Sequence, residues 1–307
     1  MKRILFIGLA VLSIVSCKKE TFNRDHSNES STKLKKSVTE TKIIPDNVVW
    51  GVGSDHRVYR WNAATLTWTE PTPGAGLVDL SVGNDSNGAV WGLGADSRVY
   101  RRVEVGNYWA EPNSSMRLSQ ISALSLTEAW GVYQISATER KIYKTTNGGA
   151  SWTVVSASGL PNYNGKLGLT TIKVMPDNRI AGLGRDWKIY TFNVNTNQWS
   201  ILPNYSYGSN PEGTYRQLTG IMDGNTIWAI KYGAPEPDQH IYQYSFNQPF
   251  GDYWSEPNYN AQLTYFSASR HGHIWGLSST NHIYKWNGSY WDEPSPTARL
   301  VKISSGY

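Results

Sequence analysis

The sequence predicts an all-β protein, a six-bladed β-propeller whose blades have four strands each. Three observations favour this fold class. An aromatic-rich unit recurs six times, its members are short segments rich in β-branched and aromatic residues, and Gly, Asn or Asp residues usually follow them. Successive copies begin 41, 39, 51, 47 and 47 residues apart. Repetition at a period of about 40 to 50 residues is typical of a radial array of small sheets.

The first element of the unit is a strand that carries Trp-Gly and then a hydrophobic residue. We expect its Trp to pack between neighbouring blades, although the edge of the ring can also stack on a sugar. The Gly after it suits a close backbone approach near the crowded axis. The six copies are Trp50–Val52, Trp91–Leu93, Trp130–Val132, Ala181–Leu183, Trp228–Ile230 and Trp275–Leu277. The fourth copy is degenerate, because Ala181 stands where the others have Trp.

The second element is a strand that carries Val-Tyr or Ile-Tyr, and a hydrogen-bond donor precedes it in every copy. The Tyr residues are Tyr59, Tyr100, Tyr143, Tyr190, Tyr242 and Tyr284. The donors are Arg57, Arg98, Lys141, Lys188, His240 and His282. A repeated donor of this kind suits a phosphate or carboxylate group on a glycan. The alternative is that these side chains only extend over the packed surface of the blade.

The third element is a strand with a lone Trp, at Trp68, Trp109, Trp152, Trp199, Trp254 and Trp291. Four copies continue as Trp-x-Glu-Pro, which places glutamates at Glu70, Glu111, Glu256 and Glu293. Proline has no N–H to donate, so it suits the end of an outer edge strand and blocks extension of the sheet. The glutamates and the Trp rings beside them can bind sugar hydroxyls and sugar faces. The alternative is a solvated charge at the blade edge.

The fourth element is a Leu-x-x-hydrophobic strand before each Trp-Gly strand. Its copies begin at Leu77, Leu118, Leu169, Leu218, Leu263 and Leu300. The folded region opens on the second strand of a unit, at Val48, and the last Leu-type strand, Leu300–Ser304, has no unit of its own. We therefore expect this strand to pair with Trp50–Val52, which closes the ring and buries both free edges. The segment Lys42–Ile44 is a rival for the same place, because it resembles Ile172–Val174.

The repeats "VWGVGSDHRVYRWNAATLTWTE" and "VWGLGADSRVYRRVEVGNYWAE", each followed by a Leu-type strand, resemble the tectonin repeat. The resemblance covers residues 48–307. It implies a propeller like those of tectonins and the similar tachylectin-type lectins, which are commonly six-bladed and bind carbohydrate or bacterial lipopolysaccharide through repeated sites. Other tectonin-repeat proteins bind protein partners instead, so the resemblance leaves both kinds of partner open.

The first 17 residues read as a secretory signal, with a short basic start and an apolar run too short to span a bilayer. Ile14–Cys17 resembles the lipobox of bacterial lipoproteins, which implies that Cys17 carries acyl chains. Residues 18–47 are Ser, Thr, Lys and Glu with almost no aromatic residue, so we expect a disordered tether. These features predict a lipid-anchored protein of the cell envelope, in the outer membrane of a Gram-negative bacterium. The propeller then occupies residues 48–307.

The charge balance argues against binding to nucleic acid. Residues 18–42 carry seven basic and four acidic side chains, which leaves 20 of each in residues 43–307. The basic character of the chain therefore belongs to the tail, whereas a nucleic-acid interface needs a basic patch on the fold. The basic tail beside a lipid anchor suits anionic lipid headgroups, and the alternative is a tether that is merely solvated. We expect the protein to be monomeric.

Two enzyme-like patterns are weak. Thr145–Trp152 resembles the Asp-box of sialidase-type propellers, with Asn147 in place of Asp, and in those enzymes this motif is a structural turn. His271 and His273 stand two apart, with no third metal ligand indicated. We expect neither a metal nor a cofactor.

The sequence thus predicts a non-enzymatic, lectin-like surface lipoprotein that recognises glycan or lipopolysaccharide through repeated sites. The alternatives are a protein-interaction scaffold in an envelope complex and a degenerate sialidase-like hydrolase. The sugar, the number of binding blades and the leaflet that holds the anchor stay open.

Overall fold

The computed structural model describes residues 48–83, 88–160, 162–175, 179–202, 215–219, 226–232, 239–246, 253–258, 262–269 and 273–306. The predictions for Cys17, for the tether at residues 18–47 and for Lys42–Ile44 lie outside these residues. Within the described ranges, no helix has the length and apolar character that crossing a bilayer requires.

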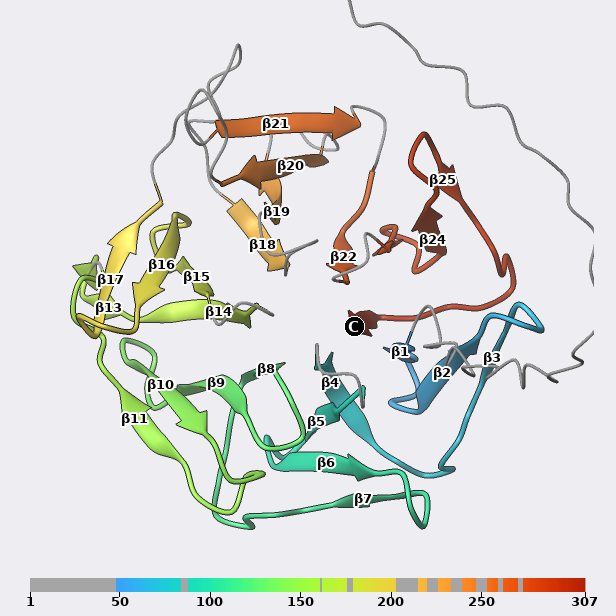
Figure 1. Cartoon of the computed structure of the whole chain (residues 1–307), viewed down its shortest axis with the longest axis horizontal. Helices are drawn as coiled ribbons and strands as arrows, with labels where there is room; N and C mark the ends of the chain where they lie inside the picture. Colours follow the sequence, from blue (N-terminus) through green and yellow to red (C-terminus); the bar gives the residue numbers. More distant parts are fainter. Residues whose placement is uncertain are drawn as a thin grey trace, which may run out of the picture. The chain divides into compact units, whose positions relative to one another are not determined.

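Six four-stranded antiparallel sheets follow one another around a central axis, which confirms the predicted propeller (Figure 1). Blade 1 contains β26 (Lys302–Gly306), β1 (Val48–Val52), β2 (Val58–Asn62) and β3 (Thr67–Thr69). Blade 2 contains β4 (Leu77–Val82), β5 (Val90–Gly94), β6 (Val99–Val103) and β7 (Tyr108–Ala110). Blade 3 contains β8 (Gln120–Ala123), β9 (Ala129–Gln134), β10 (Arg140–Thr145) and β11 (Thr153–Val155).

Blade 4 contains β14 (Leu169–Val174), β15 (Ile180–Gly184), β16 (Ile189–Asn193) and β17 (Gln198–Ile201). Blade 5 contains β18 (Tyr215–Thr219), β19 (Thr226–Tyr232), β20 (Gln239–Ser245) and β21 (Tyr253–Asn258). Blade 6 contains β22 (Tyr265–Ala268), β23 (Ile274–Leu277), β24 (Ile283–Trp286) and β25 (Trp291–Asp292). A separate two-stranded hairpin, β12 (Asn162–Tyr163) with β13 (Lys166–Leu167), precedes blade 4.

The C-terminal strand closes the ring, as the sequence predicts. β26 pairs antiparallel with β1 and places Ser304 opposite Trp50 and Ile303 opposite Gly51. In Figure 1 this red strand reaches the centre of the ring beside the blue strand β1. Blade 1 therefore joins the two ends of the folded chain, and neither end of the ring offers a free inner edge.

The Trp of the Trp-Gly strand packs between blades, which confirms that prediction. Trp91 in β5 is 0% exposed, and its ring meets that of Trp152 in blade 3 edge to face at 6.2 Å. Trp50 in blade 1 meets Trp109 in blade 2 in the same way at 6.4 Å. Edge-to-face pairs of this kind add to the free energy gained from burying the rings.

The Gly after this Trp is explained by a leucine. A Cβ at Gly92 would lie 2.3 Å from Leu77 Cδ1, and one at Gly51 would lie 2.3 Å from Leu300 Cδ1. We expected a close approach of backbone near the axis, whereas the nearest atoms belong to the side chain of the Leu-type strand in the same blade. The Trp-Gly and Leu-x-x-hydrophobic elements are thus two halves of one packing unit.

In four blades, a Lys or Arg on the third strand lies over the buried Trp of the second strand. Register places Arg60 opposite Trp50, and its guanidinium lies 5.6 Å from the centre of that ring. Arg101, Lys144 and Lys285 lie in the same way over Trp91, Trp130 and Trp275. The other two blades lack the cation at this position, because Ala181 lies opposite Thr191 in blade 4 and Trp228 lies opposite Gln243 in blade 5.

Four serines on the innermost strands link neighbouring blades, and we call them the serine belt: Ser81, Ser122, Ser267 and Ser304. Each is buried and accepts a hydrogen bond from a backbone N–H of the next blade, at 2.9 to 3.0 Å. A buried N–H without such a partner would cost about 1–3 kcal/mol. In blade 4, Lys173 occupies the same register position, opposite Ala181.

Candidate functional site

The predicted cations and the predicted glutamates meet on the same blades. Arg57 Nη1 lies 3.3 Å from Glu70 Oε2, and Arg98 Nη1 lies 3.3 Å from Glu111 Oε1. His282 Nδ1 contacts Glu293 Oε1 directly. Each cation precedes the third strand of its blade and each glutamate follows the fourth, so antiparallel pairing brings the two together. Two sets of residues that the sequence predicts separately therefore meet in three blades, as an arginine–glutamate ion pair in blades 1 and 2 and as a histidine–glutamate pair in blade 6.

The remaining blades differ. Lys141 in blade 3 pairs with Glu139 at 3.8 Å, since Val154 holds the place of the glutamate. Lys188 in blade 4 is exposed, and Ile201 holds that place there. In blade 5 the side chains of His240, Trp254 and Glu256 lie outside the described part of the chain.

An aspartate in the turn before the third strand completes the pair in two blades and was not predicted. Asp55 Oδ1 accepts a hydrogen bond from the N–H of Arg57, and Asp55 Oδ2 accepts one from the Tyr59 hydroxyl at 3.1 Å. The Arg57 N–H is the largest cause that holds the pKa of Asp55 below its usual value. Asp96 Oδ1 likewise accepts a hydrogen bond from the N–H of Arg98.

The sequence does contain a signal for these aspartates. Gly-x-Asp-x-(Arg or Lys)-hydrophobic-Tyr occurs at Gly53, Gly94 and Gly184. In blade 4, Asp186 accepts a hydrogen bond from the Tyr190 hydroxyl at 2.8 Å. Burial raises the pKa of Tyr190 above its ordinary value, and this hydrogen bond adds to the effect.

The outer Trp residues mainly pack against the preceding blade. Trp68 in blade 1 meets Trp275 of blade 6 at 6.1 Å, and Trp109 in blade 2 meets Trp50 of blade 1. Trp68, Trp109 and Trp291 are half-buried. Their indole nitrogens are buried without a hydrogen-bond partner. Most of each ring is therefore part of the core.

Trp291 is different because it lines a hollow of about 340 Å³ on blade 6. Its neighbours there are Tyr284, Gln262, Leu263, Ser278, Ser279 and Thr280. We call this hollow the blade 6 groove. The Oγ of Ser278 accepts a hydrogen bond from the backbone N–H of His282, so the groove adjoins the His282–Glu293 pair. Two aromatic rings beside three hydroxyl side chains and a histidine–glutamate pair are the kinds of group that bind a sugar ring.

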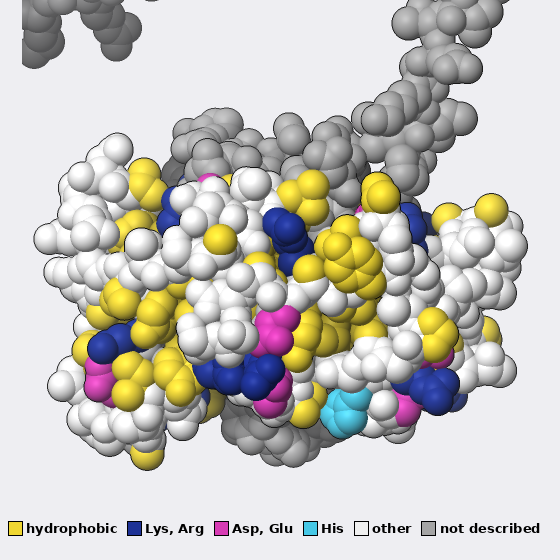
Figure 2. Space-filling view, turned by 90° about the horizontal axis from the view of Figure 1, so that it is seen from below, with side chains coloured by type: hydrophobic (Ala, Val, Ile, Leu, Met, Phe, Trp, Pro, Cys, Tyr) yellow, Lys and Arg dark blue, Asp and Glu magenta, His cyan; other side chains and the backbone are white. Residues whose placement is uncertain are grey.

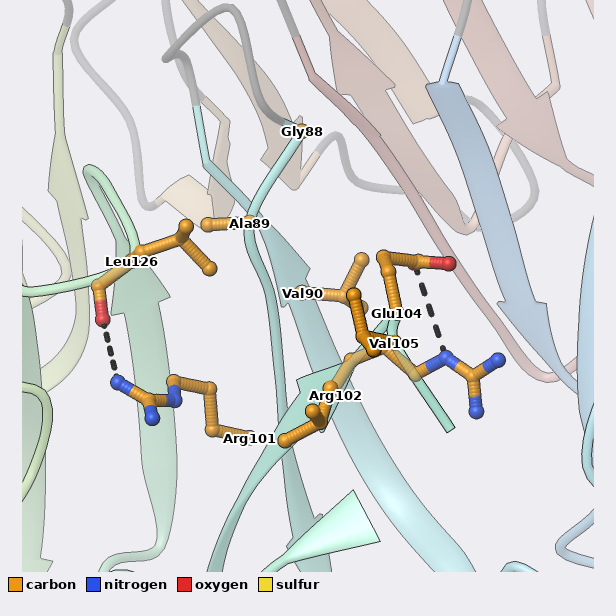
Figure 3. A pocket seen from close by; sticks show the side chains of 9 residues that line it. Gly88, Ala89, Val90, Arg101, Arg102, Glu104, Val105 and Leu126 are labelled. Carbon is orange, nitrogen blue, oxygen red and sulfur yellow. Dashed lines mark hydrogen bonds and ion pairs between the residues drawn. The ribbon is translucent and has the colours of Figure 1, made fainter. Parts of the chain in front are cut away.

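A larger hollow of about 430 Å³ lies on blade 2 and is mostly aliphatic. Figure 3 shows Arg101 turned toward the carbonyl of Leu126 and Arg102 turned toward Glu104 on its opposite side. Val90, Val103 and Val105 also line it. Among the described residues, no aromatic side chain and no predicted site residue lines this hollow, so it fits a sugar less well than the blade 6 groove.

The charges on the face shown in Figure 2 lie in separate groups. Lys and Arg side chains stand beside Asp and Glu side chains there, and hydrophobic side chains lie between the groups. The ion pairs of blades 1 and 2 have this character. The described residues form no continuous basic patch on this face.

The Asp-box-like segment is a turn. Asn147 Oδ1 accepts hydrogen bonds from the Thr145 hydroxyl and from the N–H of Ser151, both at 3.0 Å. Gly148 and Gly149 have φ values of 73° and 91°, which favour glycine. Within the described ranges, no three His, Cys, Asp or Glu side chains are placed to hold a metal ion, and His271 lies outside these ranges.

Comparison with known proteins gives one family and several propellers. The model of the Tectonin domain family matches residues 11–232. No curated protein sequence matches the chain. TolB from Acinetobacter baumannii is 9% identical over 85% of this chain and 67% of its own, with a TM-score of 0.59. Oligogalacturonate lyase in complex with manganese is 12% identical over 79% of this chain and 70% of its own, with a TM-score of 0.52. Likeness at these identities shows the fold alone.

Proposed function

Because the chain belongs to the tectonin family, we propose that it is a non-enzymatic protein that binds carbohydrate chains at the edges of its blades. The blade 6 groove carries this proposal. Trp291 and Tyr284 offer apolar rings to the face of a sugar, and Ser278, Ser279 and Thr280 offer hydroxyls to its edge. The neighbouring His282–Glu293 pair adds a donor and an acceptor.

Repetition supports a polymeric ligand. Blades 1 and 2 carry the equivalent charged pairs, Arg57–Glu70 and Arg98–Glu111, so neighbouring blades present similar polar groups. A single shallow site of this kind binds weakly. A chain that engages several blades gains affinity through effective concentration, by a factor of about 100 to 10,000. The proposed ligand is therefore a polysaccharide or lipopolysaccharide rather than a free monosaccharide.

A glycan array probed with the full chain tests the proposal. We expect binding to a few related polysaccharides, with half-saturation at least tenfold weaker for the Trp291→Ala variant. Tyr290→Ala is the matched control, because Tyr290 is 61% exposed and does not line the groove. Silence of the whole array, or equal losses for both variants, would contradict glycan binding at this groove.

The cellular setting is part of the proposal. We infer lipidation at Cys17 and attachment to the outer membrane from the lipobox-like sequence Ile14–Cys17. Labelling of producing cells with a radioactive fatty acid should mark the protein and should not mark the Cys17→Ser variant. Label that persists in this variant would refute the anchor.

Apolar turns favour one alternative, a scaffold that binds proteins. Val105 is 89% exposed, and Leu66 and Val194 are both 59% exposed. All three lie in the turn between the third and fourth strands, in blades 2, 1 and 4. Exposed aliphatic side chains repeated on one edge suit a protein surface better than a sugar. A silent glycan array with a stoichiometric envelope protein in pull-downs, lost on Val105→Asp, would establish this alternative.

A further inference from the structure

A cavity of about 300 Å³ lies on the axis of the propeller, and all six innermost strands line it. Its wall includes Asp79 from β4, Lys173 from β14 and Lys302 from β26. Gln217 from β18 and Tyr265 from β22 complete the polar lining that matters here. This cavity is distinct from the blade 6 groove, with which it shares no polar side chain.

The charges in this cavity do not neutralise one another by contact. Among the described residues, no ion pair within 4.0 Å joins Asp79 to Lys173 or to Lys302. Lys302 Nζ lies 4.6 Å from the centre of the Tyr265 ring. Two ammonium groups and one carboxylate therefore surround an open space with an excess of one positive charge.

The environment of these groups is poorly solvated. Burial raises the pKa of Asp79, against the opposing pull of Lys302 and Lys173. Burial likewise lowers the pKa of Lys173, against the pull of Asp79. Both side chains keep some accessible surface, but that surface faces the cavity. A charge held in such a place is stabilised by a partner of opposite charge.

Gln217 adds an acceptor without a donor. The side chain is 8% exposed, its Nε2 donates to the carbonyl of Phe266, and its Oε1 is buried with no hydrogen-bond partner. Buried polar atoms are rarely left unpaired unless a ligand or water satisfies them. Gln217 thus requires a donor, and the two lysines require an acceptor with negative charge. Asp79 receives the backbone N–H groups of Leu80 and Ile121 and can accept further hydrogen bonds.

The sequence marks this place as a departure from the repeat. Lys173 stands where four other blades have the belt serine, and Ala181 opposite it is the residue that replaces Trp. Asp79, Gln120, Thr171, Tyr265 and Lys302 occupy equivalent positions on their strands yet differ in chemistry. An axial site is therefore single and asymmetric, in contrast to the repeated blade edges.

We propose that the axial cavity binds one small carboxylate that also carries hydroxyl groups, a sugar acid such as a uronate. Lys173 and Lys302 hold the carboxylate by charge-assisted hydrogen bonds. Asp79 and Gln217 accept hydrogen bonds from the hydroxyls. The volume accommodates one sugar ring, so the ligand is a free sugar acid or the terminal residue of a chain.

Calorimetric titration of the full chain with glucuronate, glucose and acetate tests this site. We expect one glucuronate per chain, bound at least tenfold more tightly than glucose or acetate. Lys173→Ser, which restores the residue of four other blades, should weaken glucuronate at least tenfold, and Lys302→Gln should do the same. Lys285→Gln is the matched control, because Lys285 lies over Trp275 and outside the cavity.

The outcomes separate this site from the blade 6 groove. Trp291→Ala should leave glucuronate binding unchanged, whatever the glycan array shows. Thermal unfolding confirms that each variant is folded before titration. The proposal is overturned if glucuronate does not bind, if acetate binds as tightly as glucuronate, or if both folded lysine variants bind it as the unmodified protein does.

Discussion

Arg98 and Glu111 form a pair that stabilises the fold very little. The Arg98 side chain is 39% exposed and the Glu111 side chain is 24% exposed, with 3.3 Å between them. Exposed pairs of this kind contribute about 0–1 kcal/mol to the free energy of unfolding. The repetition of the pair in three blades therefore suggests that it orients groups for a ligand.

Glu111→Gln separates these two roles. We expect the free energy of unfolding in urea to fall by less than about 1 kcal/mol, because the pair is solvent-screened. Binding to the polysaccharide identified on the array should weaken severalfold, since the carboxylate is lost and Asp96 alone then pairs with Arg98. A drop in stability of several kcal/mol with unchanged binding would assign the pair to the fold instead.

Asp79→Asn is expected to change how stability depends on pH. Burial raises the folded-state pKa of Asp79 above its ordinary value, so its contribution to stability is present at low pH and lost as pH rises through the folded-state pKa. Asn carries no charge. The melting temperature of the variant, measured relative to the unmodified protein, should therefore rise between about pH 3 and pH 7.

Asp55→Asn should change the pH dependence of the melting temperature in the opposite direction. The pKa of Asp55 is lowered, chiefly by the N–H of Arg57, so its contribution is present above pH 3.8 and lost as pH falls. This variant should lose melting temperature relative to the unmodified protein over the same rise in pH. Equal trends for the two variants would show that neither carboxyl behaves as its surroundings imply.

At the level of strands, the Gly-Leu contact within each blade is the most repeated packing feature. In blades 1, 2, 3, 4 and 6, a Cβ on the Gly of the Trp-Gly strand would lie 2.2 to 2.4 Å from a leucine Cδ1. The leucine stands at or just before the start of the innermost strand, and that strand lines the axis. A change at the Gly therefore affects the position of the innermost strand.

Gly92→Ala should lower the free energy of unfolding by about 1–3 kcal/mol, because Leu77 is buried and must shift. Chemical denaturation measures the loss. Gly76→Ala is the control, since a Cβ there meets nothing within 4 Å. If both variants unfold alike, the contact with Leu77 does not explain the glycine.

The strands and their order could be predicted from the sequence because each carries a distinct aromatic or leucine marker. The pairing of Arg57 with Glu70 could not, although both residues were predicted for the site. They stand 13 residues apart, and only the register of the hairpin β2–β3 shows that they meet. The hairpin β12–β13 also lacks a marker, and its segment reads as part of a loop between Ser156 and Lys166.

Blade 5 departs from the expectation that the proline of Trp-x-Glu-Pro ends the outer strand. The sequence places Pro257 at the end of an outer strand, yet β21 continues through Asn258 with an irregular register. An outer edge strand tolerates proline because its N–H side has no partner strand.

The axial residues could not be predicted for a different reason. Asp79, Lys173 and Lys302 are far apart in sequence, and only the closed ring brings them together.

For the whole molecule, the closing strand is the element on which the ring depends. Truncation after Arg299 removes β26, exposes the edge of β1 and removes Lys302 from the axial cavity. We expect the truncated chain to lose its cooperative thermal transition and to associate through the open edge. Light scattering and calorimetry measure these two effects. A monomer with an unchanged melting temperature would show that the ring does not need this strand.

The pairing of β26 with β1 also determines when the ring can close during synthesis of the chain. After Val52 has been added to the growing chain, the ribosome must add about 250 more residues before it reaches Gly306. At about 5–20 residues per second, this takes on the order of 10 to 50 seconds. During that interval blade 1 has only its three N-terminal strands, so the chain cannot close into a ring while it is being made. The ring can therefore close only after the last strand has been synthesised.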